Sequence, residues 1–248
     1  LGLEDEAWTE IVPTLPNFLF VPQNQDLKQR YDEGFSIVDF MPLRSVGIVT
    51  ARDALTIDMD KDKLWARVKN FREIGPEEAR AKYKLGPDAQ DWKVESAQKD
   101  INENFSEDFI VKIAYRPYDS RWTYYTGTSR GFHCRPRAEV MKHMAGKDNL
   151  ALCIPGQSKD GVGGFVVASV AGHKAFSAYD INSLFPLYVY SEDGLDRVFN
   201  FEPKLLQKMQ KIAGEKGCPL PSEVDVFDYI YSVLNWPSYK AIYTEFLK

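Results

Sequence analysis

Residues 109–137 place the strongest constraint on the fold, because they join a buried strand to a run of arginines and aromatic residues. The run FIVKIA at 109–114 is apolar and β-branched, which predicts a strand, and residues 122–125 predict a second one. Residues 127–131 begin and end with glycine and indicate a turn, and Pro136 is typical of a first helical turn. We therefore expect these arginines at strand ends and in loops, where side chains project outward from a sheet.

The same region is positively charged in a chain that is acidic overall, with a formal net charge of −5. Residues 111–148 hold eight Lys and Arg against three Asp and Glu, so they carry +5 and the rest of the chain carries −10. Clustered Lys and Arg neutralise nucleic-acid phosphates, and the distribution of charge matters more than its sum. The region is therefore either a surface for duplex DNA or a set of arginines paired with acids from elsewhere in the fold.

Short apolar runs elsewhere predict further strands at 17–22, 46–50, 149–155, 164–170 and 184–190. A polar run closed by Gly34 predicts a helix at 24–33. The strands do not alternate with helices regularly, as a doubly wound sheet would require. The sequence therefore predicts an α+β fold with a twisted, mostly antiparallel β-sheet.

Two helical regions accompany the predicted sheet. From about residue 60 to 104 the chain is highly charged, and Leu64, Val68 and Phe71 form one apolar stripe at helical spacing. We interpret this region as a solvated helical insertion with no chemistry of its own. The last quarter is helical, and Ser222 with Asp225 predicts a capping box. The expected organisation is a β-rich domain at 1–200 that contains the insertion, with a C-terminal helical subdomain at 201–248 packed on it.

Signatures of catalysis and metal binding are missing from the sequence. It contains no GxSxG, HExxH or paired CxxC motif, and its three histidines and three cysteines show no ligand spacing. Pro87-Asp88 and Asp91-Trp92-Lys93 look like the PD…DxK signature of metal nucleases, but they fall in a helical stretch bounded by Gly-Pro pairs. We therefore predict no catalytic, metal-binding or cofactor-binding residue in this chain.

Composition also bears on where the chain resides. No stretch approaches the roughly 18 apolar residues of a membrane span, and the acidic N-terminus does not have the basic start of a signal peptide. The cysteines form no disulfide pattern, which suits a reducing compartment. We expect a cytoplasmic protein without membrane contact and, because the first residue is Leu1 instead of Met, a fragment of a longer polypeptide.

Several long runs resemble one known family. They are YRPYDSRWTYYTGTSRGFHCRPRAEVMKHM, NLALCIPGQ, FVVASVAGHKAF, SLFPLYVY and VFDYIYSVLNWPSYKAIYTEFLK. Together they resemble the C-terminal part of Type ISP restriction-modification enzymes and of related Type IIG-like adenine methyltransferase polypeptides. The resemblance covers most of the chain and is weakest at about 72–104. Relatives often carry an Arg-Gln pair after the strand that begins NL, where this chain has Gly156-Gln157.

The resemblance implies a target-recognition, or specificity, domain. Such a domain reads an asymmetric sequence in double-stranded DNA and positions the methyltransferase domain of the same polypeptide on an adenine. It implies no catalysis by this fragment and no cofactor within it, although the parent enzyme would use S-adenosylmethionine. Whether the parent also cleaves DNA is left open.

We predict the DNA-binding residues from their placement at loops and at the helix start. The first group is Arg130, His133, Arg135, Arg137 and Lys142, and the second is the loop residues Gln157, Ser158 and Lys159. These would contact phosphates or reach base edges. Arg116 and Arg121 are flanked by aromatic residues, so we assign them to strand packing or ion pairing, with Asp119 as a partner for either one.

Two other functions stay open at this point. One is a protein-interaction or scaffold domain of the same polypeptide that docks other subunits without direct base readout. The other is an independent Mg²⁺-dependent nuclease, which the weak PD…DxK likeness alone favours.

Overall fold

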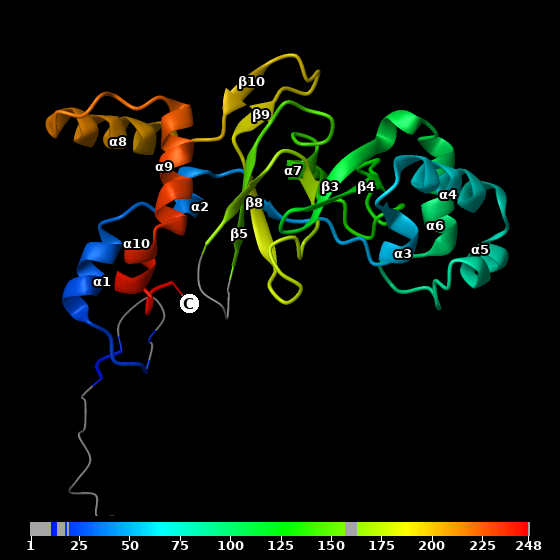
Figure 1. The fold of residues 1–248 in the computed structure, drawn as a ribbon, viewed down its shortest axis with the longest axis horizontal. Coiled ribbons are helices and arrows are strands. Elements are labelled where there is room, and N and C mark those ends of the chain that lie inside the picture. The colour runs from blue at the N-terminus through cyan, green and yellow to red at the C-terminus, as the bar shows by residue number, and fades with distance from the viewer. Residues whose placement is uncertain (1–10, 14–17, 19, 157–162, 248) are drawn as a thin grey trace, which may run out of the picture.

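The computed structural model describes residues 11–13, 18, 20–156 and 163–247. It confirms an α+β fold with mostly antiparallel sheets. Figure 1 shows an elongated molecule in which the strands occupy the middle and helices occupy both ends. The helices near one end are α3 (Asp53–Thr56), α4 (Lys61–Glu73), α5 (Pro76–Lys82) and α6 (Val94–Glu103). Those near the other are α1 (Gln25–Asp32), α2 (Ile37–Phe40), α8 (Pro203–Glu215), α9 (Glu223–Asn235) and α10 (Pro237–Ile242).

The first sheet contains the strands predicted at 109–114 and 122–125. Its order is β2 (Ile57–Asp58), β4 (Asp119–Tyr124), β3 (Ile110–Arg116) and β7 (Val170–Ala171). β3 and β4 form an antiparallel hairpin, whereas β7 runs parallel to β3. Beyond β7, the chain at Ile48 and Val49 bridges to Gly172 on one side and to Arg135 on the other. The sheet therefore extends, through single bridges, to the stretch 115–137 that holds the arginine and aromatic residues, called the arginine segment below.

A second sheet supplies the centre of the molecule. Its order is β1 (Ser45–Val46), β8 (Asn182–Pro186), β5 (Ala151–Pro155) and β6 (Phe165–Val167), and all pairings are antiparallel. Every residue of β5 is buried, as its continuous apolar run predicts. A small antiparallel pair is formed by β9 (Tyr188–Tyr190) and β10 (Arg197–Phe199).

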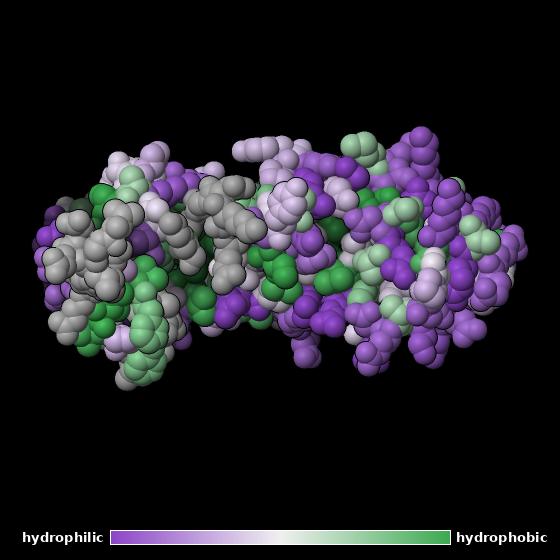
Figure 2. All heavy atoms as spheres, turned by 90° about the horizontal axis from the view of Figure 1, so that it is seen from below, coloured by the Kyte–Doolittle hydropathy of each residue, from purple (hydrophilic) through white to green (hydrophobic). Residues whose placement is uncertain are grey.

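The charged region at 60–104 is more than a solvated insertion. Leu64, Val68 and Phe71 face inward as the helical spacing predicts. They share one hydrophobic cluster with Tyr124 of β4 and with Phe132 of the arginine segment. Figure 2 shows the hydrophilic outer surface at this end of the molecule. The insertion thus has a solvated face and a buried face, and the buried face supports the arginine segment.

The C-terminal helices are confirmed, together with the capping box between Ser222 and Asp225. Val226 and Phe227 of α9 are buried against Leu152 of β5 and Phe185 of β8. Not all aromatic residues of these helices belong to the core, because the exposed side chains include Tyr229 and Trp236. Among the described residues, no helix is both long enough and apolar enough to cross a bilayer.

Four strand predictions need correction. In the run 17–22, residues 17 and 19 lie outside the described residues, and Phe18, Phe20 and Val21 are exposed and not in a strand. The run 46–50 forms only the end of β1 and two isolated bridges. The run 164–170 is divided between β6 and β7, which belong to different sheets. The run 184–190 is likewise divided between β8 and β9, which also belong to different sheets. The predicted helix at 24–33 is α1, with Asn24 as its N-cap.

Candidate nucleic-acid interface

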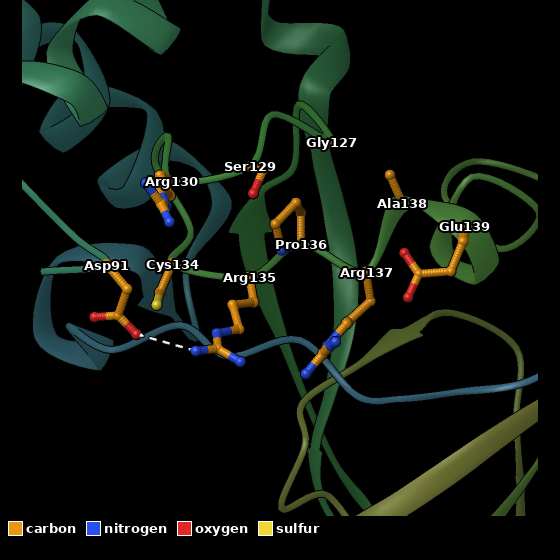
Figure 3. Close-up of a pocket in the computed structure, with 10 residues that line it drawn as sticks. All are labelled: Asp91, Gly127, Ser129, Arg130, Cys134, Arg135, Pro136, Arg137, Ala138 and Glu139. Carbon is orange, nitrogen blue, oxygen red and sulfur yellow. Dashed lines mark ion pairs between the residues drawn. The ribbon is translucent and has the colours of Figure 1, made fainter.

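A cavity of about 310 Å³ lies beside the segment that follows β4. Three predicted DNA-binding residues, Arg130, Arg135 and Arg137, line it together (Figure 3). The other lining residues are Asp91, Gly127, Ser129, Cys134, Pro136, Ala138 and Glu139. Figure 3 shows the side chains of Arg135 and Arg137 extending from the backbone to the same side. Three guanidinium groups against two carboxylates give the cavity a surplus of positive charge.

Two of these arginines hold unusual backbone conformations. Arg130 has a φ of 58° and Arg137 a φ of 55°, in the left-handed region. A side chain with a Cβ adopts this region at a conformational cost of roughly 1–2 kcal/mol. Such a conformation persists where the surroundings determine it, and it is enriched at binding sites. Arg137 also begins α7 (Ala138–Met141), because its carbonyl accepts from the N–H of Val140 and Met141.

A buried carboxylate of α6 shapes the loop that carries Arg130. Asp100 Oδ2 accepts hydrogen bonds from the backbone N–H of Phe132 and from Thr126 Oγ1, each at 2.8 Å. Its other oxygen accepts from Asn104 Nδ2 at 3.0 Å. A Cβ added at Gly131 would overlap the Asp100 carboxylate, so only glycine fits there. The loop therefore takes its shape from the insertion.

Arg135 combines a fixed backbone with a loosely held side chain. Its N–H and C=O exchange hydrogen bonds with those of Val49 at 3.1 and 3.0 Å. Its guanidinium lies 3.6 Å from Asp91 Oδ2, with the two side chains 57% and 43% exposed. An exposed pair of this kind contributes at most about 1 kcal/mol. A phosphate oxygen could therefore replace Asp91 as the partner of Arg135.

Neighbouring groups shift the pKa of Asp91, the acid of this pair. The Cys134 thiol donates a hydrogen bond to Asp91 and is the main reason that the pKa of this carboxyl lies below its usual range, with Arg135 and Arg130 adding to the effect. Burial raises the pKa of the Cys134 thiol, and its bond to Asp91 adds to the rise. Asp91 is therefore an ionised acceptor at neutral pH, and Cys134 is a protonated donor.

Arg137 has one polar atom without a partner. Its Nε is buried and makes no hydrogen bond among the described residues. A buried donor left without an acceptor is unfavourable, and a charged one more so. A phosphate or base acceptor that entered the cavity would supply the missing hydrogen bond.

His133 does not belong to the exposed face, and the prediction that placed it there is wrong. It is only 2% exposed. Its Nε2 lies 2.8 Å from Thr123 Oγ1, which donates to Thr56 O. Thr123 therefore accepts from His133, which fixes the protonated nitrogen as Nε2. Burial lowers the pKa of His133 to about 4, so the ring is neutral at physiological pH.

The other predicted DNA contacts do not line the cavity or lie outside the described residues. Lys142 is exposed at the C-terminal end of α7, outside the set of residues that lines the cavity. Gln157, Ser158 and Lys159 lie outside the described residues, so their proposed role remains a prediction.

Arg116 and Arg121 hold the structural positions that we assigned to them. Arg121 binds Asp119 with two nitrogens, and the shortest of these contacts is 2.7 Å. The guanidinium groups of Arg116 and Arg121 lie 4.4 and 4.0 Å from the centroid of the Tyr115 ring. Arg116 also donates to the carbonyl of Lys174 at 3.1 Å. Asp119 is thus the partner of Arg121, and both arginines are engaged within the fold.

The carboxylates of the nuclease-like motif serve as partners of arginines. Asp88 accepts from Arg80 at 3.0 Å and from the N–H of Val94 at 3.2 Å. Asp91 faces Arg135. In the part of the chain that the structure describes, no group of three or more His, Cys, Asp or Glu could hold a metal ion.

The sequence interpretation missed Asp91 and Asp100, which build the site from the insertion. The available signal was the charge balance, since the acids of 60–104 complement the excess of arginine at 111–148. That signal names the two regions, but it does not show which acid meets which arginine.

Comparison with known proteins places the chain in a family. The model of the Type ISP C-terminal specificity domain matches residues 39–248, and the chain belongs to that family. No curated protein matches the sequence.

Solved structures share the fold. A cryo-EM structure of a DrdV–DNA complex matches 98% of the chain with a TM-score of 0.64 and 19% identity. A nuclease-deletion mutant of the Type ISP restriction-modification enzyme LlaGI, in complex with a DNA substrate mimic, matches 96% with a TM-score of 0.58 and 17% identity. The ATP-dependent Type ISP enzyme LlaBIII bound to DNA matches 84% with a TM-score of 0.58 and 14% identity. The chain spans 25%, 22% and 14% of those three chains, respectively.

Proposed function

We propose that this chain recognises a specific sequence in double-stranded DNA as the specificity module of a restriction-modification enzyme. The observation that carries the proposal is the cavity that Arg130, Arg135 and Arg137 line together. Membership of a specificity-domain family supports it, as do the DNA complexes of the structural neighbours.

The cavity is suited to contact with the phosphate backbone. Guanidinium groups bind phosphate through paired, charge-assisted hydrogen bonds, which are stronger than neutral ones. Arg135 would exchange Asp91 for a phosphate, and Arg137 would direct its unpartnered Nε to an acceptor. Phosphate contacts set the register of a protein on the duplex, and base contacts then supply specificity. Lys142 and the loop at Gln157, Ser158 and Lys159 are our candidates for additional contacts.

The finer part of the proposal concerns the whole polypeptide. The domain would position an adenine methyltransferase domain of the same chain on its target base, and that domain would bind S-adenosylmethionine. This part is supported by the family and by the small fraction of the neighbouring chains that the present chain spans. Residues that precede Leu1 would test it directly, because an amino-methyltransferase motif is expected there.

A salt titration of duplex binding tests the core of the proposal. The full chain is titrated against a labelled duplex that has been selected from a randomised pool with the wild-type protein. Roughly five phosphate contacts predict a slope near −4 to −5 in a plot of log affinity against log salt concentration. Undetectable or salt-independent binding would overturn the proposal.

A scaffold role is the second candidate, and the exposed apolar side chains of the C-terminal helices favour it. Tyr229 and Trp236 are each 57% exposed, and Ile242 is 51% exposed. If this role were the main one, Arg135→Ala and Arg137→Ala would leave DNA modification by the parent enzyme intact. Assembly of the parent enzyme would be disturbed instead.

A further inference from the structure

The tip of the β3–β4 hairpin holds a residue that the fold does not explain. Arg116 of β3 pairs directly with Asp119 of β4, so Pro117 and Tyr118 form a two-residue turn. The Tyr118 side chain is fully exposed to solvent. Its φ of 61° lies in the left-handed region. After proline, this second turn position normally carries glycine or asparagine, which adopt positive φ readily.

Nothing within the described fold compensates for a tyrosine in this conformation. Hydrogen bonds, ring contacts and cation–π contacts of the described residues do not include the Tyr118 side chain. Strain that packing does not explain is a reason to look for a ligand at that position. An aromatic ring that is held away from the protein on a short turn is free to meet a partner.

The base of the hairpin is rigid and cationic. The Tyr115 ring contacts the guanidinium groups of both Arg116 and Arg121. The Tyr115 hydroxyl donates to Asp53 Oδ2 at 2.9 Å, and this tie joins the hairpin to the start of α3. Arg116, Arg121 and the nearby Lys174 exceed the carboxylates Asp119 and Asp53 by one positive charge around the tip. Arg116 and Arg121 are engaged within the fold, so the hairpin offers a polyanionic partner mainly the exposed ring at its tip.

Backbone bridges connect this hairpin to the arginine cavity. The N–H of Gly172 donates to Ala114 O at 3.0 Å, the N–H of Ile48 donates to Ala171 O at 2.8 Å, and the next residue, Val49, pairs with Arg135. Three steps between neighbouring segments separate Ala114 of β3 from Arg135, and at strand spacing they amount to about 14 Å. The major groove of B-DNA is about 12 Å wide. A single duplex is therefore large enough to contact both the hairpin and the arginine cavity.

We propose that Tyr118 is a DNA-contact residue and that its ring packs against a sugar or base edge of the duplex bound at the arginine cavity. The inference rests on the proposed function and adds a second contact point to it. An aromatic ring can stack on any base, and the phenol hydroxyl can also donate to a groove acceptor.

Three substitutions at Tyr118 test the inference with the selected duplex described above. Tyr118→Gly and Tyr118→Asn remove the ring but suit a positive φ, so we expect unchanged or higher thermal stability together with about tenfold weaker binding. Tyr118→Phe should retain most of the affinity. Tyr229→Ala is the matched control, because it removes an exposed tyrosine from α9 and should not change binding.

The possible outcomes distinguish a failure of this inference from a failure of the proposed function on which it rests. If the wild-type chain binds the duplex and both ring-free variants bind equally well, the inference fails while the proposed function stands. If the wild-type chain does not bind, both fail together. If the ring-free variants assemble poorly with the rest of the parent enzyme but bind DNA normally, Tyr118 contacts protein instead. A photo-crosslink from a 5-bromouracil duplex to the peptide containing Tyr118 would confirm direct contact.

Discussion

The two halves of the arginine segment, residues 115–125 and residues 128–137, differ in how their guanidinium groups are partnered. In the first half, Arg121 binds Asp119 with two nitrogens, and both Arg116 and Arg121 contact the Tyr115 ring. In the second half, Arg135 has only a loose, exposed pair with Asp91, and the buried Nε of Arg137 has no hydrogen-bond partner among the residues that the structure describes. The hydrogen bonds of the first pair are used within the fold, whereas the second pair keeps donors that a ligand could engage. Residue type is the same in both halves, so the difference lies in the neighbours.

The largest expected effect is a loss of stability on substitution of Asp100, the carboxylate that shapes the second half. Asp100→Ala leaves the buried Phe132 N–H and the Thr126 hydroxyl without their acceptor. Each unsatisfied buried group costs about 1–3 kcal/mol, so we expect a total loss of about 2–5 kcal/mol in the free energy of unfolding. Urea denaturation measures it. Glu103→Ala on the exposed side of α6 is the control, and an equal loss there would contradict a special role for Asp100.

The pH dependence of stability tests whether His133 is neutral and internal. Its pKa of about 4 in the folded state lies below the ordinary value of 6.5, so the unfolded chain takes up a proton first as the pH falls. Stability from this group is therefore complete above about pH 6.5 and declines toward pH 4, by up to about 3 kcal/mol. In His133→Gln this decline should be absent. His143 and His173, whose pKa values are also lowered by burial, remain in both proteins, so the difference isolates His133.

Substitutions in the two halves should differ in their effect on DNA affinity. We expect the double variant Arg135→Ala/Arg137→Ala to bind the selected duplex with roughly 30-fold lower affinity, which is about 2 kcal/mol. The salt slope should fall by about 2, because each lost phosphate contact removes about 1. Lys211→Ala, which removes an exposed charge of α8, should change neither quantity. A double variant that binds like the wild type would remove the cavity from the interface.

The smallest expected effect belongs to the first half. Arg121→Ala removes the bidentate partner of Asp119 and a contact with the Tyr115 ring, so we expect a loss of about 1 kcal/mol in the free energy of unfolding. DNA affinity should stay within about twofold of wild type once the protein is folded, a change of less than about 0.5 kcal/mol. Parallel denaturation and binding measurements check both parts. If Arg121→Ala weakened DNA binding as much as the double variant, the division between the halves would be wrong.

Local patterns were sufficient for many elements. The β3 strand, the apolar stripe of Leu64, Val68 and Phe71, and the capping box of Ser222 all depend on residues close together in the chain. The resemblance to the specificity-domain family also rested on sequence runs, and the family model confirms it. The short segments around Ile48 were harder to predict, because two single bridges to distant residues decide their structure.

The sequence by itself determined that an arginine-rich segment follows a buried strand in an acidic chain, and it marked Arg116 and Arg121 as internal. Only the tertiary structure decided that His133 is buried between exposed arginines and that Arg130, Arg135 and Arg137 share one cavity. The physical reason is the range of the interactions. Strand and helix preferences act between near neighbours, whereas the freedom of a guanidinium depends on carboxylates far away in the chain. Asp91 lies 44 residues before Arg135 and Asp100 lies 32 residues before Phe132, and only folding brings these residues together.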